Sequence, residues 1–323
     1  MISPTFRTSV TIRTAPVPVS YQQPVMLMGS CFADNMGSML RDMGLPCCIN
    51  PFGTLYNPVS IDRSLRRLIS GSTYTAADLF SYQGLWNSWD HHGAFSHPEA
   101  DVCLDHINTS LRDGTRHLAT ASHLFLTLGT AYIYRLRQTG QVVANCHKVP
   151  LSEFIPSMLT VQEVRDTLTS VIAAVHRFNA NLQVVVSVSP VRHHKEDLHL
   201  NTVSKAILLS AVAELQQTFP EVLYFPSYEL MNDELRDYRF YDEDMVHPSP
   251  LAMRYIGDRF ADAFFSHETQ ALALQVSKLR KALHHRPLHP DTEEYHRFKE
   301  TTIQQVKALQ QQYPSICFDS DLA

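Results

Sequence analysis

The sequence lacks any continuous apolar run of the roughly 18 to 20 residues that a membrane-spanning helix needs. This holds although 44% of its 323 residues are hydrophobic. Residues 1–19 are rich in Thr and Pro and lack the apolar core of a secretory signal peptide. We therefore expect a cytoplasmic protein with no membrane partner.

An excess of positive charge is also lacking, since 27 Lys and Arg residues face 32 Asp and Glu residues, for a net charge of −5. Such a chain has no general electrostatic attraction for nucleic acid. The six cysteines contain no Cys-x-x-Cys pair and fit no secreted disulfide framework, so we expect reduced thiols. No carboxylate pattern accompanies the adjacent His91 and His92. We therefore expect neither a metal nor a cofactor.

Four short apolar runs have the character of buried strands, and segments of helical periodicity lie between them. The runs cover residues 25–28, 124–128, 184–188 and 222–225, and the helical segments cover 32–43, 161–178, 201–219 and 250–265. Strands that alternate with helices predict a mostly parallel sheet with helices on both faces. In such sheets the reactive residues gather at the carboxyl ends of the strands.

Two segments depart from this alternation. Residues 50–116, which include Trp89, are interpreted as an insertion after the first βα unit that could shape a pocket. The tail, residues 267–323, is charged and Gln-rich, and two prolines split it into two helices. The prediction is a catalytic domain over residues 20–266 with a helical C-terminal extension, through which the protein could form a homo-oligomer.

Two nucleophilic side chains stand at the end of the first predicted strand, where Gly29, Ser30 and Cys31 precede a helix. A second unusual segment, just before the last helix of the sheet domain, contains Asp244 and His247. A carboxylate three residues before a histidine can fold back onto the imidazole, fix its tautomer and stabilise the imidazolium. A nucleophile and a His/Asp pair on one rim of a sheet are what nucleophilic acyl transfer requires.

The stretch at residues 29–33, Gly-Ser-Cys-Phe-Ala, resembles the defining motif of the GSCFA family, a branch of the SGNH (GDSL-like) hydrolase superfamily. The supporting stretches follow in order at residues 50–54, 127–131, 144–148, 187–192 and 244–248. The resemblance runs from about residue 24 to 265 and leaves the tail outside. It implies a three-layer α/β/α sandwich and an esterase or acyltransferase with a catalytic triad of the Ser/His/Asp type.

The nucleophile stays open between two neighbouring residues. The superfamily's first block reads Gly-Asp-Ser-Leu, and without a gap its Ser falls on Cys31, which favours Cys31. A helix N-terminus also stabilises a thiolate, and thiolates attack acyl carbons well. If the turn is shifted by one residue, Ser30 is the nucleophile and Cys31 packs inward as a small hydrophobe.

The resemblance also implies an oxyanion site, for which the backbone N–H groups of Cys31 and Gly53 are candidates. The superfamily's Gly-x-Asn block falls on residues 129–131, where Ala131 replaces the asparagine. Asn145 is a substitute donor from the hairpin that follows.

The remaining candidates are substrate-binding residues. Trp89 and His92 could bind a sugar or acyl group by stacking and hydrogen bonding, or they could be core and rim residues of the insertion. Arg192 could bind a substrate carboxylate or phosphate. The sequence thus predicts an acyl-ester hydrolase or acyltransferase that acts on a small-molecule or glycan acyl ester. The alternative is a catalytically inactive ligand-binding protein of the same fold, for which the missing asparagine argues.

Overall fold

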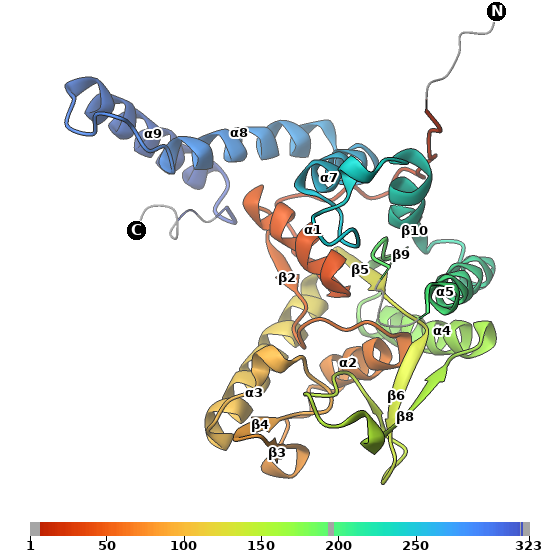
Figure 1. Ribbon diagram of the computed structural model, residues 1–323. Helices are drawn as coiled ribbons and strands as arrows, with labels where there is room; N and C mark the ends of the chain where they lie inside the picture. Colours follow the sequence, from red (N-terminus) through yellow and green to blue (C-terminus); the bar gives the residue numbers. More distant parts are fainter. Residues whose placement is uncertain (1–6, 193–196, 317, 319–323) are drawn as a thin grey trace, which may run out of the picture.

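The computed structural model describes residues 7–192, 197–316 and 318, and a five-stranded sheet lies at its centre (Figure 1). The strand order is β10-β9-β5-β1-β2, and all the pairings are parallel. This order places β1 (Val25–Gly29) between β5 (His123–Leu128) and β2 (Cys47–Ile49). Helices cover both faces, so the predicted α/β fold with a mostly parallel sheet is confirmed.

The helices and remaining strands match the predicted pattern and add to it. The helices are α1 (Cys31–Asp42), α2 (Pro58–Ser70), α3 (Ala100–Thr120), α4 (Val161–Phe178), α5 (Leu198–Thr218), α6 (Ser227–Glu229), α7 (Pro250–Phe264), α8 (His267–Leu283) and α9 (Glu293–Gln312). The other strands are β3 (Phe80–Tyr82), β4 (Leu85–Asn87), β6 (Tyr132–Leu136), β7 (Val142–Val143), β8 (Phe154–Met158), β9 (Gln183–Val188) and β10 (Leu223–Phe225). Each predicted run and helical segment corresponds to one of these elements.

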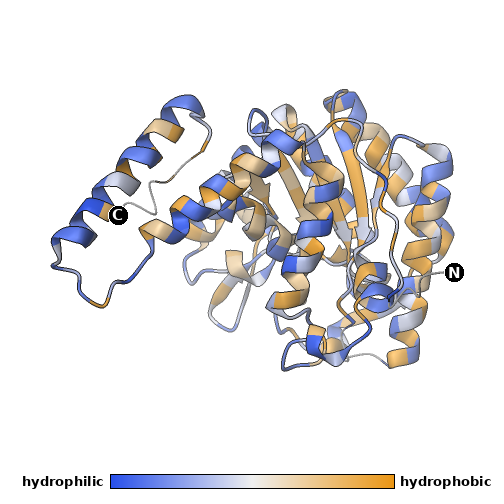
Figure 2. Ribbon diagram, turned by 90° about the horizontal axis from the view of Figure 1, so that it is seen from above, coloured by the Kyte–Doolittle hydropathy of each residue, from blue (hydrophilic) through white to orange (hydrophobic). Residues whose placement is uncertain are grey.

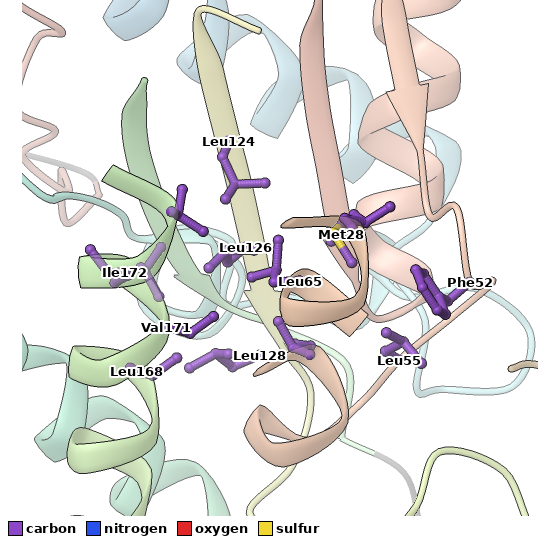
Figure 3. Close-up of a cluster of buried hydrophobic side chains, with 14 of the residues drawn as sticks. Met28, Phe52, Leu55, Leu65, Leu124, Leu126, Leu128, Leu168, Val171 and Ile172 are labelled. Atoms are coloured by element: carbon purple, nitrogen blue, oxygen red, sulfur yellow. The ribbon is translucent and has the colours of Figure 1, made fainter. Parts of the chain in front are cut away.

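The sheet separates two hydrophobic cores, because successive side chains of a strand point to opposite faces. Met26 and Met28 of β1 pack with α2 and α4 on one face, whereas Val25 and Leu27 pack with α1 and α7 on the other. Every residue of β1 and β5 is buried, which is why both strands are mostly apolar. Figure 3 shows the first core, in which side chains of the helices pack on side chains of the sheet. The helices contribute Leu65 of α2 and Leu168, Val171 and Ile172 of α4, and the sheet contributes Met28 of β1 and Leu124, Leu126 and Leu128 of β5.

Helix-capping residues fix where several helices begin. Thr160 and Glu163 form a reciprocal capping box at the start of α4. Asn57 caps α2 and Ser249 caps α7, each followed by a proline in the first turn. These caps set the directions in which the chain enters the helices that flank the sheet.

The segment over residues 50–116 contains α2, the β3-β4 hairpin and most of α3. The buried faces of α2 and α3 belong to the first core, so these helices form part of the layer that covers the sheet. A separate antiparallel sheet has the order β7-β6-β8. Its β6-β7 pair corresponds to the hairpin expected after residues 129–131, whereas β8 has no counterpart in the sequence prediction.

The C-terminal tail forms two helices, α8 and α9, which lie side by side and project away from the sheet (Figures 1 and 2). Val276 and Leu279 of α8, and Val306 and Leu309 of α9, are buried. The predicted break at the two prolines falls in the loop between the helices. Residues 317 and 319–323 of the predicted tail lie outside the described residues.

We expect Gly29→Ala to destabilise the protein strongly. Gly29 has φ +137°, and a Cβ built on it would lie 2.1 Å from the carbonyl oxygen of Thr127 in β5. Backbone strain and overpacking together should lower the free energy of unfolding by about 3 kcal/mol or more, measured by urea denaturation. Gly71→Ala is the matched control, because Gly71 has φ +62° and a Cβ added to it would meet no atom within 4 Å. An equal loss in both variants would contradict the role of the close approach to Thr127.

Candidate active site

Cys31 lies at the carboxyl end of β1, at the first residue of α1. Its Sγ is 3.6 Å from Nε2 of His247, a residue 216 positions later in the chain. Cys31 is half-buried. The predicted Cys31 and His247 therefore lie within contact distance at one rim of the sheet.

Asp244 and His247 belong to one tight turn just before α7. Nδ1 of the His247 ring is 2.6 Å from Oδ2 of Asp244. The other carboxylate oxygen, Oδ1, accepts the backbone N–H groups of Val246 and His247, each at 2.9 Å. Donation by the His247 backbone N–H, followed by the His247 side chain and the Val246 N–H, holds the pKa of the Asp244 carboxyl well below its usual range. Asp244 thus stays ionised and orients the imidazole toward Cys31.

Ser30 is placed differently from its neighbour. It is 1% exposed, and its Oγ has no hydrogen-bond partner among the described residues. Its backbone N–H donates to the Thr127 carbonyl oxygen at 3.1 Å, and its carbonyl accepts the N–H of Ala33. Of the two adjacent candidates, the structure places the sulfur of Cys31, and not the Ser30 hydroxyl, against the His247 ring.

Several groups act on the charge of the Cys31 thiol. Burial raises its pKa most, and the nearby Asp34 carboxylate raises it further. The backbone N–H of Phe32, the charge of Lys205 and the N–H of Cys31 itself oppose this rise. The backbone N–H groups at the N-terminus of α1 and the charge of Lys205 therefore favour the thiolate, whereas burial and Asp34 disfavour it.

Asp34 connects the turn that bears Cys31 to the loop after β2. Its carboxylate accepts Nδ2 of Asn50 at 2.6 Å and the Thr54 hydroxyl at 2.9 Å. Oδ1 of Asn50 in turn accepts the backbone N–H of Gly29 at 2.8 Å. This network fixes the backbone on which Cys31 stands.

The N–H groups of Gly53 and of residues 129–131, where oxyanion donors were expected, already have acceptors within the protein. The N–H of Gly53 donates to the Asn50 carbonyl oxygen at 2.7 Å and so closes a turn. The N–H groups of Gly129 and Thr130 both donate to the Tyr56 carbonyl oxygen. Ala131, at the place of the expected asparagine, donates its N–H to Ser204 Oγ.

Asn145 lies in a turn rather than in a strand. Its Oδ1 accepts the backbone N–H of His147 at 2.8 Å, and both His147 and Lys148 have positive φ. This geometry follows β7, which ends at Val143. Cys146 and His147 therefore do not lie on an extended strand, because the backbone has already turned.

Trp89 and His92 belong to the segment between β4 and α3. Trp89 stacks on Phe80, with ring centroids 3.6 Å apart, and its edge meets His147 and Phe154. His92 accepts the N–H of Ala94 through Nδ1 and thereby caps a short 3-10 helix. The contacts described for these two side chains do not include Cys31, Asp244 or His247.

Arg192 lies beyond the carboxyl end of β9 and is partly exposed. Its Nη2 donates to Thr202 Oγ1 of α5 at 2.7 Å. Burial raises the pKa of Tyr241, and the charge of Arg192 partly opposes this rise. Tyr241 forms a β-bridge with Pro248, which follows His247 directly. Arg192 is thus near the same rim as the His247 turn.

Sequence reasoning missed Tyr56 and Lys205. A Cβ on Gly129 would lie 3.1 Å from Cδ1 of the Tyr56 ring, so this ring covers the end of β5. Burial, with the charges of Cys31 and Asp34, raises the pKa of Tyr56 to about 12. Lys205 is 1% exposed in α5. A lysine on the buried face of an apolar helix is the one signal that could have drawn attention to it.

No group of three or more His, Cys, Asp or Glu side chains able to hold a metal is found within residues 7–192, 197–316 and 318. In the same part of the chain, no helix is both long and apolar enough to cross a membrane. A cavity of about 430 Å³ lies between residues 20–22, α8 and the end of α9. Its lining does not include any residue of the Cys31 site.

Comparison with known families settles the relationship. The family model described as "GSCFA family" matches residues 24–260, which include Cys31, Asp244 and His247. The chain belongs to the GSCFA family. Residues 276–323 match a second description of the same family, "GSCFA domain protein, C-terminal domain".

Similarity to individual proteins is more distant. No curated protein matches the chain. A Streptococcus pneumonia structure described provisionally as a platelet activating factor is 12% identical with a TM-score of 0.39, over 76% of this chain and 86% of that one. An acetyl xylan esterase from the rumen bacterium Butyrivibrio proteoclasticus is 10% identical with a TM-score of 0.38, over 75% of this chain and 63% of that one. The chain thus spans less than two thirds of that esterase.

Proposed function

We propose that this GSCFA protein is an acyl-ester hydrolase or acyltransferase of the SGNH type, with Cys31 as nucleophile, His247 as general base and Asp244 as orienting carboxylate. The observation that carries the proposal is the chain of contacts from Cys31 Sγ to His247 Nε2 at 3.6 Å, and from His247 Nδ1 to Asp244 Oδ2 at 2.6 Å. This is the geometry by which a base activates a nucleophile and a third group orients the base.

The first half of the reaction forms a thioester. His247 Nε2 takes the proton from Cys31 Sγ, and the thiolate attacks the acyl carbon to form a C–S bond. The tetrahedral intermediate collapses with cleavage of the ester C–O bond, and His247 returns its proton to the departing alkoxide. Asp244 stays ionised and stabilises the imidazolium throughout.

The second half regenerates the thiol. His247 takes a proton from water or from an acceptor hydroxyl, whose oxygen attacks the thioester carbon. The C–S bond then breaks and the sulfur regains the proton from His247. Water gives a free acid, which is hydrolysis, whereas a hydroxyl gives a new ester, which is acyl transfer.

The negative oxygen of the intermediate needs preorganised donors. The N–H groups of Cys31 and Phe32 stand at the N-terminus of α1 and already act on the sulfur. We assign these two N–H groups the main role in stabilising the negative oxygen of the intermediate. Gly53 is left out because its N–H closes the turn onto Asn50.

The substrate we propose is an acyl ester of a carbohydrate or another small molecule. Trp89 and His92 remain proposed contacts of such a substrate, and the partly exposed Trp89 ring supports a sugar. Arg192 would bind an anionic group of the substrate near the His247 turn.

A second candidate is a ligand-binding protein that keeps the fold without catalysis. The observation in its favour is Ala131, which stands where an asparagine donor is expected and whose N–H is taken by Ser204. Under this alternative, an ester would bind at the rim without forming a covalent intermediate.

The test is to trap the intermediate. The protein is mixed with short-chain aryl esters and thioesters, quenched in acid, and examined by peptide mass spectrometry. We expect an acyl group on Cys31 that neutral hydroxylamine removes, as it does from thioesters but not from ordinary oxygen esters. We also expect His247→Ala to abolish turnover. An acyl group on Ser30 would overturn the assignment of the nucleophile, and no acylation with any ester would favour the ligand-binding alternative.

A further inference from the structure

Lys205 is a buried cation at the rim of the sheet for which the proposed reaction has no role so far. It is 1% exposed and ranks among the largest fully buried side chains. Its Nζ donates to the carbonyl oxygens of Gly129 and Ser189, each at 2.7 Å. These two residues lie just beyond the carboxyl ends of β5 and β9, so Lys205 joins the loops that follow two adjacent strands.

The same rim carries Cys31. Gly29 of β1 pairs with Thr127 of β5, and the Ser30 N–H donates to the Thr127 carbonyl oxygen. Gly129 follows Thr127 by two residues, so the loop that Lys205 binds begins at the same rim as the turn that bears the sulfur. Burial raises the pKa of the Cys31 thiol and the charge of Lys205 opposes this rise, while burial lowers the pKa of Lys205 and the Cys31 thiolate opposes that fall.

An unpaired charge in a protein interior is costly, and two carbonyl oxygens only partly replace the water that an ammonium loses. A neutral side chain could fill the same space without that cost. A fixed positive charge facing a thiol nevertheless has a direct use, because it favours the thiolate and the negative oxygen of the intermediate. Asp34 disfavours the thiolate from the other side, so a compensating cation matters here.

We propose that Lys205 is a positioning residue of the Cys31 site, whose buried ammonium holds the β5 and β9 loops in place and supplies the positive charge that favours the Cys31 thiolate. This inference rests on the proposed function for its use in catalysis, but its electrostatic part concerns the thiol alone. Ser204, the preceding residue of α5, binds the same loop through Ala131 and Thr130 without any charge.

The influence of the Lys205 charge on the Cys31 thiol depends on pH. Burial, and to a smaller extent the charge of Arg192, lower the pKa of Lys205 to about 7, although the Cys31 thiolate raises it. Below pH 7 the ammonium is charged and favours the thiolate, whereas above pH 7 the thiol form of the protein loses this charge. The advantage conferred by Lys205 is therefore largest below pH 7 and shrinks as the pH rises.

Other charged or titratable groups face the same sulfur and must stay unchanged in the experiment. They come from three elements: Asp34 of α1, Tyr56 of the loop before α2 and His247 of the turn before α7. Arg192, which follows β9, faces Lys205. The comparison is therefore between variants of Lys205 alone.

The experiment measures alkylation of Cys31 by iodoacetamide between pH 6 and 9, with the modified peptide quantified by mass spectrometry in the full chain. We expect Lys205→Met to slow alkylation about tenfold below pH 7, equivalent to one pKa unit of the thiol, and the difference to shrink above pH 8. The guanidinium in Lys205→Arg keeps its charge at high pH. We therefore expect Cys31 to be alkylated faster in this variant than in the unaltered protein above pH 8. Ser204→Ala, the matched control, should leave the shape of the pH profile unchanged.

The proposal is overturned if the ratio of the Cys31 alkylation rates in the unaltered protein and in Lys205→Met is the same at all pH values. A purely structural role of Lys205 would give such a constant ratio. If Lys205→Met does not fold, as judged by circular dichroism, Lys205→Arg decides: a profile identical to that of the unaltered protein overturns the proposal. Alkylation requires no ester turnover. A protein without esterase activity can therefore still pass this test, and an active esterase can fail it.

Discussion

Cys31→Ala is expected to abolish acyl transfer, whereas Ser30→Ala should leave it nearly intact. The two residues are adjacent, but only the Cys31 sulfur contacts the His247 imidazole, at 3.6 Å. Removal of a nucleophile that acts with a base lowers kcat/KM by roughly 10⁴-fold or more. The measurement is steady-state hydrolysis of the best aryl ester found in the trapping experiment.

Ser30→Ala is the matched control for this prediction, and it has a stability readout of its own. The Ser30 hydroxyl is buried without a hydrogen-bond partner among the described residues. Removing such a group should leave the free energy of unfolding unchanged or raise it by about 1 kcal/mol. Loss of activity in Ser30→Ala with full activity in Cys31→Ala would reverse the assignment of the nucleophile.

Asp244→Asn should lower kcat by about 10³- to 10⁴-fold while leaving the fold intact. The amide oxygen can still accept the backbone N–H groups of Val246 and His247, so the turn is preserved. The amide nitrogen would then face His247 Nδ1 and donate to it. That donation places the ring proton on Nε2, where His247 must instead accept the proton of Cys31.

Glu243→Gln is the control for Asp244→Asn, because it removes one negative charge from the same exposed turn without touching the imidazole. We expect its kcat to remain within about threefold, as is usual for a surface charge change. If the two substitutions lower kcat equally, the effect comes from net charge in the turn and not from the orientation of His247. Circular dichroism of both variants checks that the turn's surroundings stay folded.

The central sheet could be read from the sequence because its strands are buried on both faces. Continuous apolar runs such as Val184–Val186 are stable only where both faces of a strand are covered, and α4 has a regular apolar stripe with a capping box at its start. The strands that escaped prediction are short or mixed. β8 contains a proline and exposed residues, and β2 has only three residues of intermediate burial.

The site was predictable only as far as side-chain types and spacing allow. The Asp244 and His247 pair lies within one turn, so local spacing was sufficient to suggest the contact. Gly53 illustrates the limit, since nothing in its motif reveals that its N–H points back to Asn50. Lys205 and Tyr56 escaped because their contacts with Gly129, beyond the end of β5, are created by packing between elements far apart in the chain.

The separation of 216 residues between Cys31 and His247 has a consequence for biosynthesis. Cys31 is made before its base, which follows only after most of the sheet domain has been translated. Closing so long a loop is slow, because contacts between distant residues form late in folding. We therefore expect nascent chains to carry an unactivated thiol until β1, β5 and the His247 turn have come together. Nucleophilic reactivity at Cys31 would then report that the domain has completed its folding.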